Sequence, residues 1–146
     1  MKKIMFLAAV LLTFGISKAK ADDDRPITVT QLPATAQQFI KKHFPQQKVA
    51  YAKIERDFLD TTYDVVFTDS SKLEFFKDGQ WKEVDCRHTA VPAAIVPQQI
   101  RDFVTKNYPG VLITKIDRDK RDYELKISNG LELTFDLKFN LIEIDD

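Results

Sequence analysis

The sequence predicts an α+β fold made of two tandem α-β-β-β-β repeats, which form one continuous antiparallel sheet with both helices on one face. The first observation is an internal repeat, because residues 32–45 and 96–109 both begin with an apolar residue and proline and end with an aromatic residue and proline. The second observation is that similar trains of short alternating segments follow each copy. Self-similarity at a fixed offset indicates a duplicated structural unit.

The helix of each repeat is predicted from apolar residues at a spacing of three and four positions, which places them on one helical face. The first helix is expected to run from about Pro33 to Phe44. Proline suits the first helical turn, and Pro45 disfavours helical conformation in the residue before it and so ends the run. The equivalent apolar residues of the two copies are Ala36, Phe39, Ile40 and Phe44, and then Ile100, Phe103, Val104 and Tyr108.

Four strands are predicted after each helix, from alternating apolar residues and from turn residues between them. In the first repeat they lie at 48–57, at 63–68, around Leu73 and Phe75, and at 80–86. In the second they lie at 112–119, 123–128, 131–135 and 140–145. One helix covers four strands poorly, and a unit of about 60 residues buries too little surface alone. We therefore expect the two sheets to join edge to edge, with the face opposite the helices left open.

The domain limits follow from these patterns. Residues 1–21 are predicted to be a signal peptide, with a basic start at Lys2 and Lys3, an apolar core and the small-residue cleavage pattern Ala19-Lys20-Ala21. Residues 22–31 are expected to be a flexible mature N-terminus, because 22–26 has no apolar pattern. The first repeat is 32–86, the linker 87–95 and the second repeat 96–146. This organisation predicts a periplasmic or secreted protein with no membrane span.

Charge and composition exclude several function classes. The chain has 22 basic and 22 acidic residues, and removal of the four leader lysines leaves an acidic chain. Such a protein is a poor candidate for binding nucleic acid or anionic lipid. The single cysteine, Cys86, has no partner for an internal disulfide and is interpreted as a small buried side chain. No catalytic triad, C-x-x-C motif or phosphate-binding loop is present, and His43 and His88 have no companions. We therefore expect no enzyme activity, catalytic residue, metal or cofactor.

The chain resembles the PepSY-like family, whose fold is akin to β-lactamase inhibitor protein and which is known mainly from exported proteins of Bacteroides-type bacteria. The residues that carry the resemblance are Leu32-Pro33 with Phe44-Pro45, Asp78-Gly79-Gln80-Trp81 with Val84-Asp85-Cys86, Val96-Pro97 with Tyr108-Pro109-Gly110, and Asn129-Gly130. Their order covers essentially the whole chain after the leader. The resemblance implies this fold, an envelope location and protein binding or inhibition, and it brings no catalytic residues.

Alternation along the strands predicts which side chains face the open side of the sheet. With Phe75 and Val84 facing the helices, Phe76 and Trp81 are expected to point away and to pair across the Asp78-Gly79 turn. Exposed aromatic residues are enriched at binding hot spots. The candidate protein-binding patch is Tyr51, Lys53, Phe76, Trp81 and Glu83; the alternative is that these aromatic side chains only shield the sheet.

Three functions remain open at this point. The first is an exported non-enzymatic binding or inhibitor-like module that uses the open face to bind a protein or peptide of the cell envelope. The others are a sensor domain for a small ligand or peptide, and a structural envelope protein without a discrete site. The sequence does not identify a partner or an oligomeric state.

Overall fold

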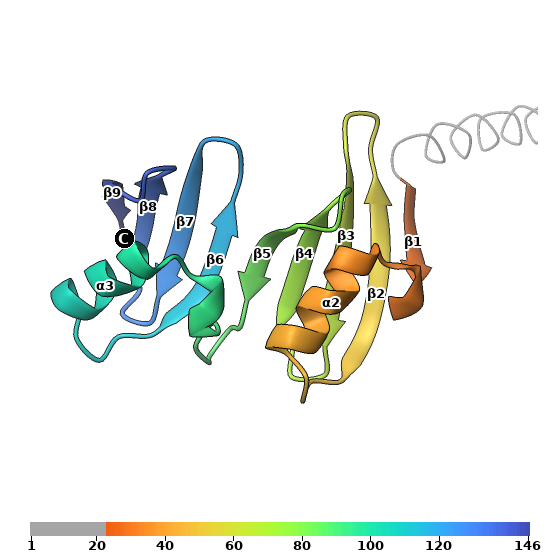
Figure 1. The fold of residues 1–146 in the computed structure, drawn as a ribbon, viewed down its shortest axis with the longest axis horizontal. Coiled ribbons are helices and arrows are strands. Elements are labelled where there is room, and N and C mark those ends of the chain that lie inside the picture. The colour runs from red at the N-terminus through yellow and green to blue at the C-terminus, as the bar shows by residue number, and fades with distance from the viewer. Residues whose placement is uncertain (1–22) are drawn as a thin grey trace, which may run out of the picture.

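A computed structural model describes residues 23–146 and shows one nine-stranded sheet with two helices on the same face (Figure 1). The helices are α2 (Ala34–His43) and α3 (Gln98–Asn107). Every strand pairs antiparallel with the next strand along the chain, from β1 to β9. The α+β class, the duplication and the continuous sheet predicted from the sequence are confirmed. The predicted signal peptide lies outside the described residues.

The strand limits follow the alternating segments of the sequence closely. The first repeat contains β2 (Val49–Arg56), β3 (Thr61–Phe67), β4 (Lys72–Phe76) and β5 (Trp81–Asp85). The second contains β6 (Ile113–Arg118), β7 (Asp122–Ile127), β8 (Glu132–Asp136) and β9 (Leu141–Asp145).

The two helices are bounded in the same way, which explains why the sequence locates them well. Pro33 and Pro97 are the N-cap residues, and the amides of Phe44 and Tyr108 close the last turns on the carbonyls four residues earlier. Each helix buries two residues of its apolar stripe against the sheet, Ala36 and Ile40 in α2 and Ile100 and Val104 in α3.

One hydrophobic core runs between the helices and the sheet through both repeats. Its fully buried centre comes from the helix-facing positions of successive strands, and it includes Val65, Leu73, Phe75, Val84, Ile116, Leu125, Leu133 and Phe135. The linker adds to this core, because Val91 and Ile95 are buried and Ala93–Ile95 forms a short 3-10 helix. Cys86 is buried too, as expected.

The repeats join where β5 pairs with β6, and we call this pairing the junction. Val84 lies opposite Ile116, and both are fully buried. The amide of Cys86 donates to the carbonyl of Thr114 over 2.9 Å. The guanidinium of Arg118 lies 3.9 Å above the ring of Trp81 and its Nε donates to the carbonyl of that residue over 2.8 Å. These contacts make the two half-sheets one sheet.

The prediction that residues 22–31 are flexible is wrong for most of the segment. Asp23–Ile27 forms β1, an edge strand paired with β2, and Val29–Gln31 forms a 3-10 turn. The strand was missed because it lacks apolar alternation. Main-chain pairing, the packing of Ile27 on the core and an ion pair of Asp24 with Lys53 hold it instead. Pro26 is compatible with this position, since an edge strand leaves one row of amides unpaired.

Candidate functional site

The side of the sheet opposite the helices, here called the open face, carries four of the five predicted site residues. Tyr51 is 53% exposed and lies opposite Val66, on the outward side of β2. Lys53 and Glu83 also project from this face, and each makes ion pairs with its neighbours. Phe76 is half-buried and lies opposite Thr62. The structure thus places these four residues on one face, spread over strands β2 to β5.

The prediction for Trp81 is wrong, because its ring lies in the core on the helix side. It is 9% exposed, its cross-strand partner is Phe75 instead of Phe76, and its ring centroid is 6.5 Å from that of Phe39 in α2. The cause is a β-bulge between the pairs of Glu74 and Phe75, where one extra residue of β5 changes the face of the side chains that precede it. The proposed aromatic pair on the open face therefore does not exist.

The dominant feature of the open face is a row of carboxylates that crosses the sheet at one register. Each member lies directly opposite the next on the neighbouring strand, except that Thr134 stands between the last two. Like charges at directly opposite positions destabilise a sheet. We call this set the acidic row; its members are Asp64, Glu74, Glu83, Asp117, Glu124 and Glu143.

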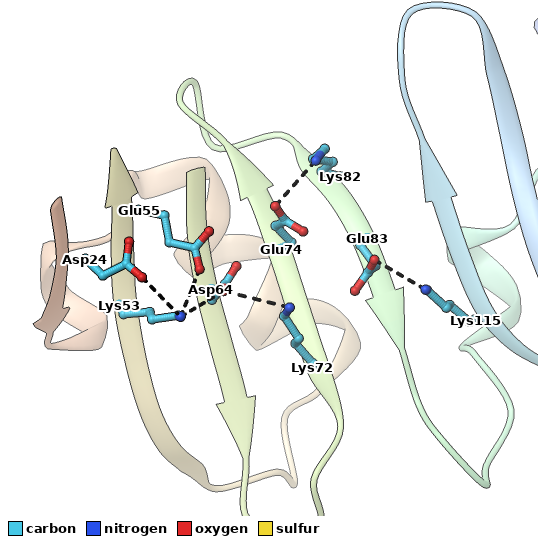
Figure 2. A network of polar contacts seen from close by, with 9 residues as sticks. All are labelled: Asp24, Lys53, Glu55, Asp64, Lys72, Glu74, Lys82, Glu83 and Lys115. Carbon is cyan, nitrogen blue, oxygen red and sulfur yellow. Dashed lines mark hydrogen bonds and ion pairs between the residues drawn. The ribbon is translucent and has the colours of Figure 1, made fainter. Parts of the chain in front are cut away.

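In the first repeat and at the junction, lysines compensate the acidic row, as Figure 2 shows. Lys53 and Lys72 lie 3.9 Å and 3.8 Å from Asp64 Oδ2. The next two members are paired in the same way, Glu74 with Lys82 at 3.4 Å and Glu83 with Lys115 at 3.6 Å. This half of the row is a network of ion pairs.

In the second repeat the acidic row is not compensated in this way. Among residues 23–146, no lysine or arginine lies within ion-pair distance of Asp117, Glu124 or Glu143. These three carboxylates line a shallow hollow of about 120 Å³ in the open face. Lys115 and Lys126 also line it, but they are paired with Glu83 and Glu132. The hollow is therefore an acidic surface with oxygen atoms available to a ligand.

Burial raises the pKa of two carboxyls of the acidic row. The pKa of Asp64 rises to about 7, because the group is buried and because Glu55 and Glu74 lie nearby, although Lys72 opposes the shift. The pKa of Asp117 rises to about 6, first through burial and then through Glu124. Within the described chain, Asp64 Oδ1 has no hydrogen-bond partner. A hydrogen bond from the protonated Asp64 carboxyl to the ionised Glu55 also raises the pKa of Asp64, so the charge of Asp64 depends on pH in the neutral range.

The charged state of the neighbouring pair is fixed more firmly. Lys53 Nζ lies 2.8 Å from Glu55 Oε1. This hydrogen bond is the main reason why the pKa of Lys53 is raised and that of Glu55 is lowered. Both side chains therefore stay ionised through the neutral range. Burial raises the pKa of the Cys86 thiol to about 11, so this thiol stays protonated and unreactive.

The structure offers no ready-made chemistry beyond this charged face. The described part of the chain contains no group of three His, Cys, Asp or Glu side chains that could hold a metal ion. No helix within residues 23–146 is long and apolar enough to cross a membrane. A wider groove of about 640 Å³ lies beside the turns near Phe76, Lys120 and Tyr123, and it is shallow and open.

The sequence reasoning missed most of the acidic row. Glu83 is the only member of the acidic row that belongs to the protein-binding patch predicted from the sequence, because that prediction rests on exposed aromatic side chains. The signal that was present is the outward position of Asp64 and Glu124, which occupy equivalent places in β3 and β7. The row becomes visible only when the strand registers are known, since a shift of one residue moves every side chain to the other face.

Comparisons with known proteins agree with the fold. Residues 19–60 and 61–143 match the family described as "Putative beta-lactamase-inhibitor-like, PepSY-like". A search of curated proteins finds no match. Three solved structures are similar over nearly their whole length, and each is named as a periplasmic protein.

The first of these is a "putative calcium-regulated periplasmic protein" of Bacteroides thetaiotaomicron, with 60% identity, a TM-score of 0.84 and coverage of 85% of this chain and 98% of that one. The second, from Bacteroides vulgatus, has 57% identity and a TM-score of 0.83 over 85% and 98% of the two chains. The third, also from Bacteroides vulgatus, has 41% identity and a TM-score of 0.80 over 86% and 100%. These relatives confirm the predicted periplasmic or secreted location, and the matched segments show that the chain belongs to the PepSY-like family.

Proposed function

We propose that the protein is a non-enzymatic binding module of the cell envelope, whose open face binds a basic segment of a protein or peptide. The observation that carries this proposal is the acidic row. Carboxylates directly opposite one another cost stability. Asp117, Glu124 and Glu143 make no ion pair with a lysine or arginine in the described chain, and Lys115 and Lys82 act on Asp117 only from beyond ion-pair distance. A cationic ligand would reduce the repulsion between these carboxylates, and this reduction would favour binding.

The shape of the site favours an extended ligand over a small molecule. Pockets for small ligands enclose about 300–1,000 Å³ and bury most of the ligand. The hollow at Asp117 and Glu124 has only about 120 Å³ and opens onto a sheet surface. Successive members of the row on neighbouring strands lie about 4.8 Å apart, and same-face lysine or arginine side chains of an extended partner segment repeat at about 6.6 Å, so several of them would lie over the row at once. Inhibition of an envelope enzyme is one form that such binding would take, in line with the description of the family.

Calcium is relevant because one of the similar structures is described as calcium-regulated. Oxygen ligands from carboxylates suit this ion, and the acidic row supplies them. The described residues do not form a group of three donors ready to hold an ion. We therefore treat Ca²⁺ as a competitor in the test and not as a resident metal.

The test uses a synthetic peptide of alternating lysine and serine, titrated by calorimetry at low ionic strength, with an alternating glutamate and serine peptide as its control. The lysine peptide is expected to bind and the glutamate peptide is not. Glu124→Gln should weaken binding about threefold to tenfold, the effect of losing a charge pair of about 1 kcal/mol. The matched control is Asp102→Asn at an exposed position of α3, and this variant should bind the lysine peptide as the wild type does.

Added salt and Ca²⁺ test whether binding depends on the charges of the acidic row. Binding through the acidic row should weaken as ionic strength rises, because surface charges are screened. Ca²⁺ should compete at a lower concentration than Na⁺ does. Equal binding of the two peptides, or equal loss in Glu124→Gln and Asp102→Asn, would show that the acidic row is not the binding surface.

A further inference from the structure

The two repeats end in equivalent strands, but only the first of them is covered on both edges. β5 lies between β4 and β6, whereas β9 pairs with β8 alone within residues 23–146. Val84 lies opposite Leu73 and Ile144 lies opposite Leu133, so the two residues hold the same place in the two repeats. Val84 is 0% exposed and Ile144 is 51% exposed. Ile144 is exposed because no strand of the described chain lies beside β9 on that edge.

The junction shows which strand fits such an edge. Ile116 of β6 faces Val84, and Lys115 faces Asp85. Lys115 also forms an ion pair with Glu83 at 3.6 Å. The main chain adds the hydrogen bond from Cys86 to Thr114. A strand with an apolar residue next to a basic one therefore satisfies an edge of this kind.

β9 presents the same chemistry to a neighbour. Glu143 lies opposite Thr134 and Asp145 opposite Glu132, which are the places that Glu83 and Asp85 hold in the first repeat. All residues of β9 after Leu141 are exposed. Two copies of β9 would bring these acids together, and like charges across a strand pair are unfavourable. A basic strand from another protein meets no such repulsion.

The other edge of the described sheet is less suited to a partner. β1 contains Pro26, which has no amide to donate, and it begins with acidic residues. Proline and charge are the usual means by which proteins protect an edge strand from pairing. β9 contains no proline and exposes Ile142 and Ile144. Both edges carry acidic residues, so the two edges differ in the proline of β1 and in the exposed isoleucines of β9.

We propose that the free edge of β9 binds an extended segment of another protein as a tenth, antiparallel strand, with an apolar residue opposite Ile144 and a basic residue opposite Asp145. In this mode, main-chain hydrogen bonds supply affinity and alternate side chains supply specificity. The proposal goes beyond binding at the open face, because it uses the edge of the sheet. It does not depend on the acidic row of the second repeat being a binding surface.

The probe is a fluorescent peptide with the sequence of residues 111–119, which contains the natural partner strand of β5. Its binding to the full chain is followed by fluorescence anisotropy. We expect saturable binding that Ile144→Lys weakens at least tenfold, because the lysine removes the apolar contact with the isoleucine of the peptide. The matched control is Leu137→Lys, in the turn before β9, where the side chain is 52% exposed. Circular dichroism checks that both variants fold.

A second peptide tests the main chain separately. Since Cys86 and Thr114 form a hydrogen-bonded pair, the pair Val84 and Ile116 two residues along is also hydrogen-bonded. Methylation of the peptide amide at the position of Ile116 should therefore abolish binding. Equal binding of the methylated and unmethylated peptides, or of Ile144→Lys and wild type, would overturn the proposal.

Two further outcomes would show that a second copy of the chain occupies the β9 edge or that the peptide binds at another surface. Dimerisation in sedimentation without peptide, lost in Ile144→Lys, would mean that a second copy occupies the edge, and it would overturn the proposal. The Glu124→Gln variant is expected to bind the peptide as the wild type does. Loss of peptide binding in Glu124→Gln with retention in Ile144→Lys would place the peptide on the open face, which also contradicts strand addition at β9.

Discussion

The first and second repeats have the same order of elements but differ in how their cores are completed. In the first, Phe39 packs against Phe75 with ring centroids 5.6 Å apart and against Trp81 at 6.5 Å. In the second, Phe103 packs against Phe135 at 5.4 Å, and the place of Trp81 is taken by the half-buried Leu141. The duplicated backbone thus carries a larger aromatic cluster in the first repeat.

The two repeats also differ in the ion pairs of the open face. The acidic row is paired with lysines from Asp64 to Glu83, and it has no such ion pairs from Asp117 onward in the described chain. The last strand is covered in the first repeat and open in the second. In this comparison the first repeat and the junction hold most of the aromatic contacts and the lysine–carboxylate pairs. Within the described chain, the second repeat holds the carboxylates without ion pairs and the strand edge on which the two proposals rest.

The largest expected effect comes from truncation of the helix anchors. Phe39→Ala should lower the free energy of unfolding by about 3 kcal/mol, and Phe103→Ala by less, because only Phe39 also contacts Trp81. Both variants should unfold in one transition in urea, since the repeats share a sheet and a core. Two separate transitions in Phe103→Ala would mean that the repeats fold independently, contrary to the structure.

The turn between β4 and β5 gives the next comparison. Gly79 has φ of +89°, and a Cβ atom there would lie 2.9 Å from Pro33 Cβ at the start of α2. Gly79→Ala should therefore cost about 2 kcal/mol in strain and displacement. Gly130→Ala has a similar φ of +94° with nothing within 4 Å, and it should cost only about 1 kcal/mol. Equal thermal unfolding midpoints for the two variants would argue against the contact with α2.

The equivalent turn of the second repeat carries a large side chain where the first repeat has Gly79. Phe139 occupies the place of Gly79 with φ of 69°, and its amide makes the same hydrogen bond to the residue three before it. Its ring packs against Tyr123 at 5.6 Å. In the first repeat the turn therefore approaches α2 through its glycine. In the second it carries an aromatic side chain, and Gln99 Nε2 of α3 donates to the Phe139 carbonyl over 3.3 Å.

Asp64 predicts a dependence of stability on pH. Its pKa in the folded protein is raised to about 7, above its ordinary value of 3.8. For a carboxyl with a raised folded pKa, the stabilising contribution is present below the unfolded pKa and is lost as pH rises through the folded pKa. Asp64→Asn should thus match the wild type near pH 4 and exceed its stability at pH 8. Urea unfolding at both values checks this, and a constant difference across the range would contradict it.

The smallest effect is expected at the junction. Arg118→Lys keeps the charge but loses the planar stack above Trp81 and the hydrogen bond from Nε to its carbonyl. An Arg-aromatic contact of this kind contributes about 1 kcal/mol. The free energy of urea unfolding should fall by about that amount. An unchanged value would show that the stack does not help to join the repeats.

Much of the fold was predictable because local patterns determine it. The prolines around α2 and α3 and the alternation in β3 and β7 placed those elements within a residue or two. β1 could not be predicted, since its position depends on pairing with β2 and not on its own apolar pattern. The duplicated order of elements then made the continuous sheet the natural solution.

The candidate site was less predictable because it depends on register. Alternation placed Tyr51, Lys53, Phe76 and Glu83 on the open face, as the structure does. It failed for Trp81, because a bulge adds a residue that no period-2 pattern reveals. The acidic row is a product of six strand registers, including the one at the junction, and turn geometry and packing fix these registers together.

The measurement that tests the account most directly is the fluorescence of Trp81, the only tryptophan of the chain. Trp81 lies where α2, β4 and the junction meet, so its environment reports whether the first repeat and β6 form one core. We predict a blue-shifted emission that acrylamide quenches poorly, and a urea transition that coincides with the one seen by far-ultraviolet circular dichroism. A red-shifted, readily quenched emission in the folded protein would contradict the burial of Trp81 and the junction built on it.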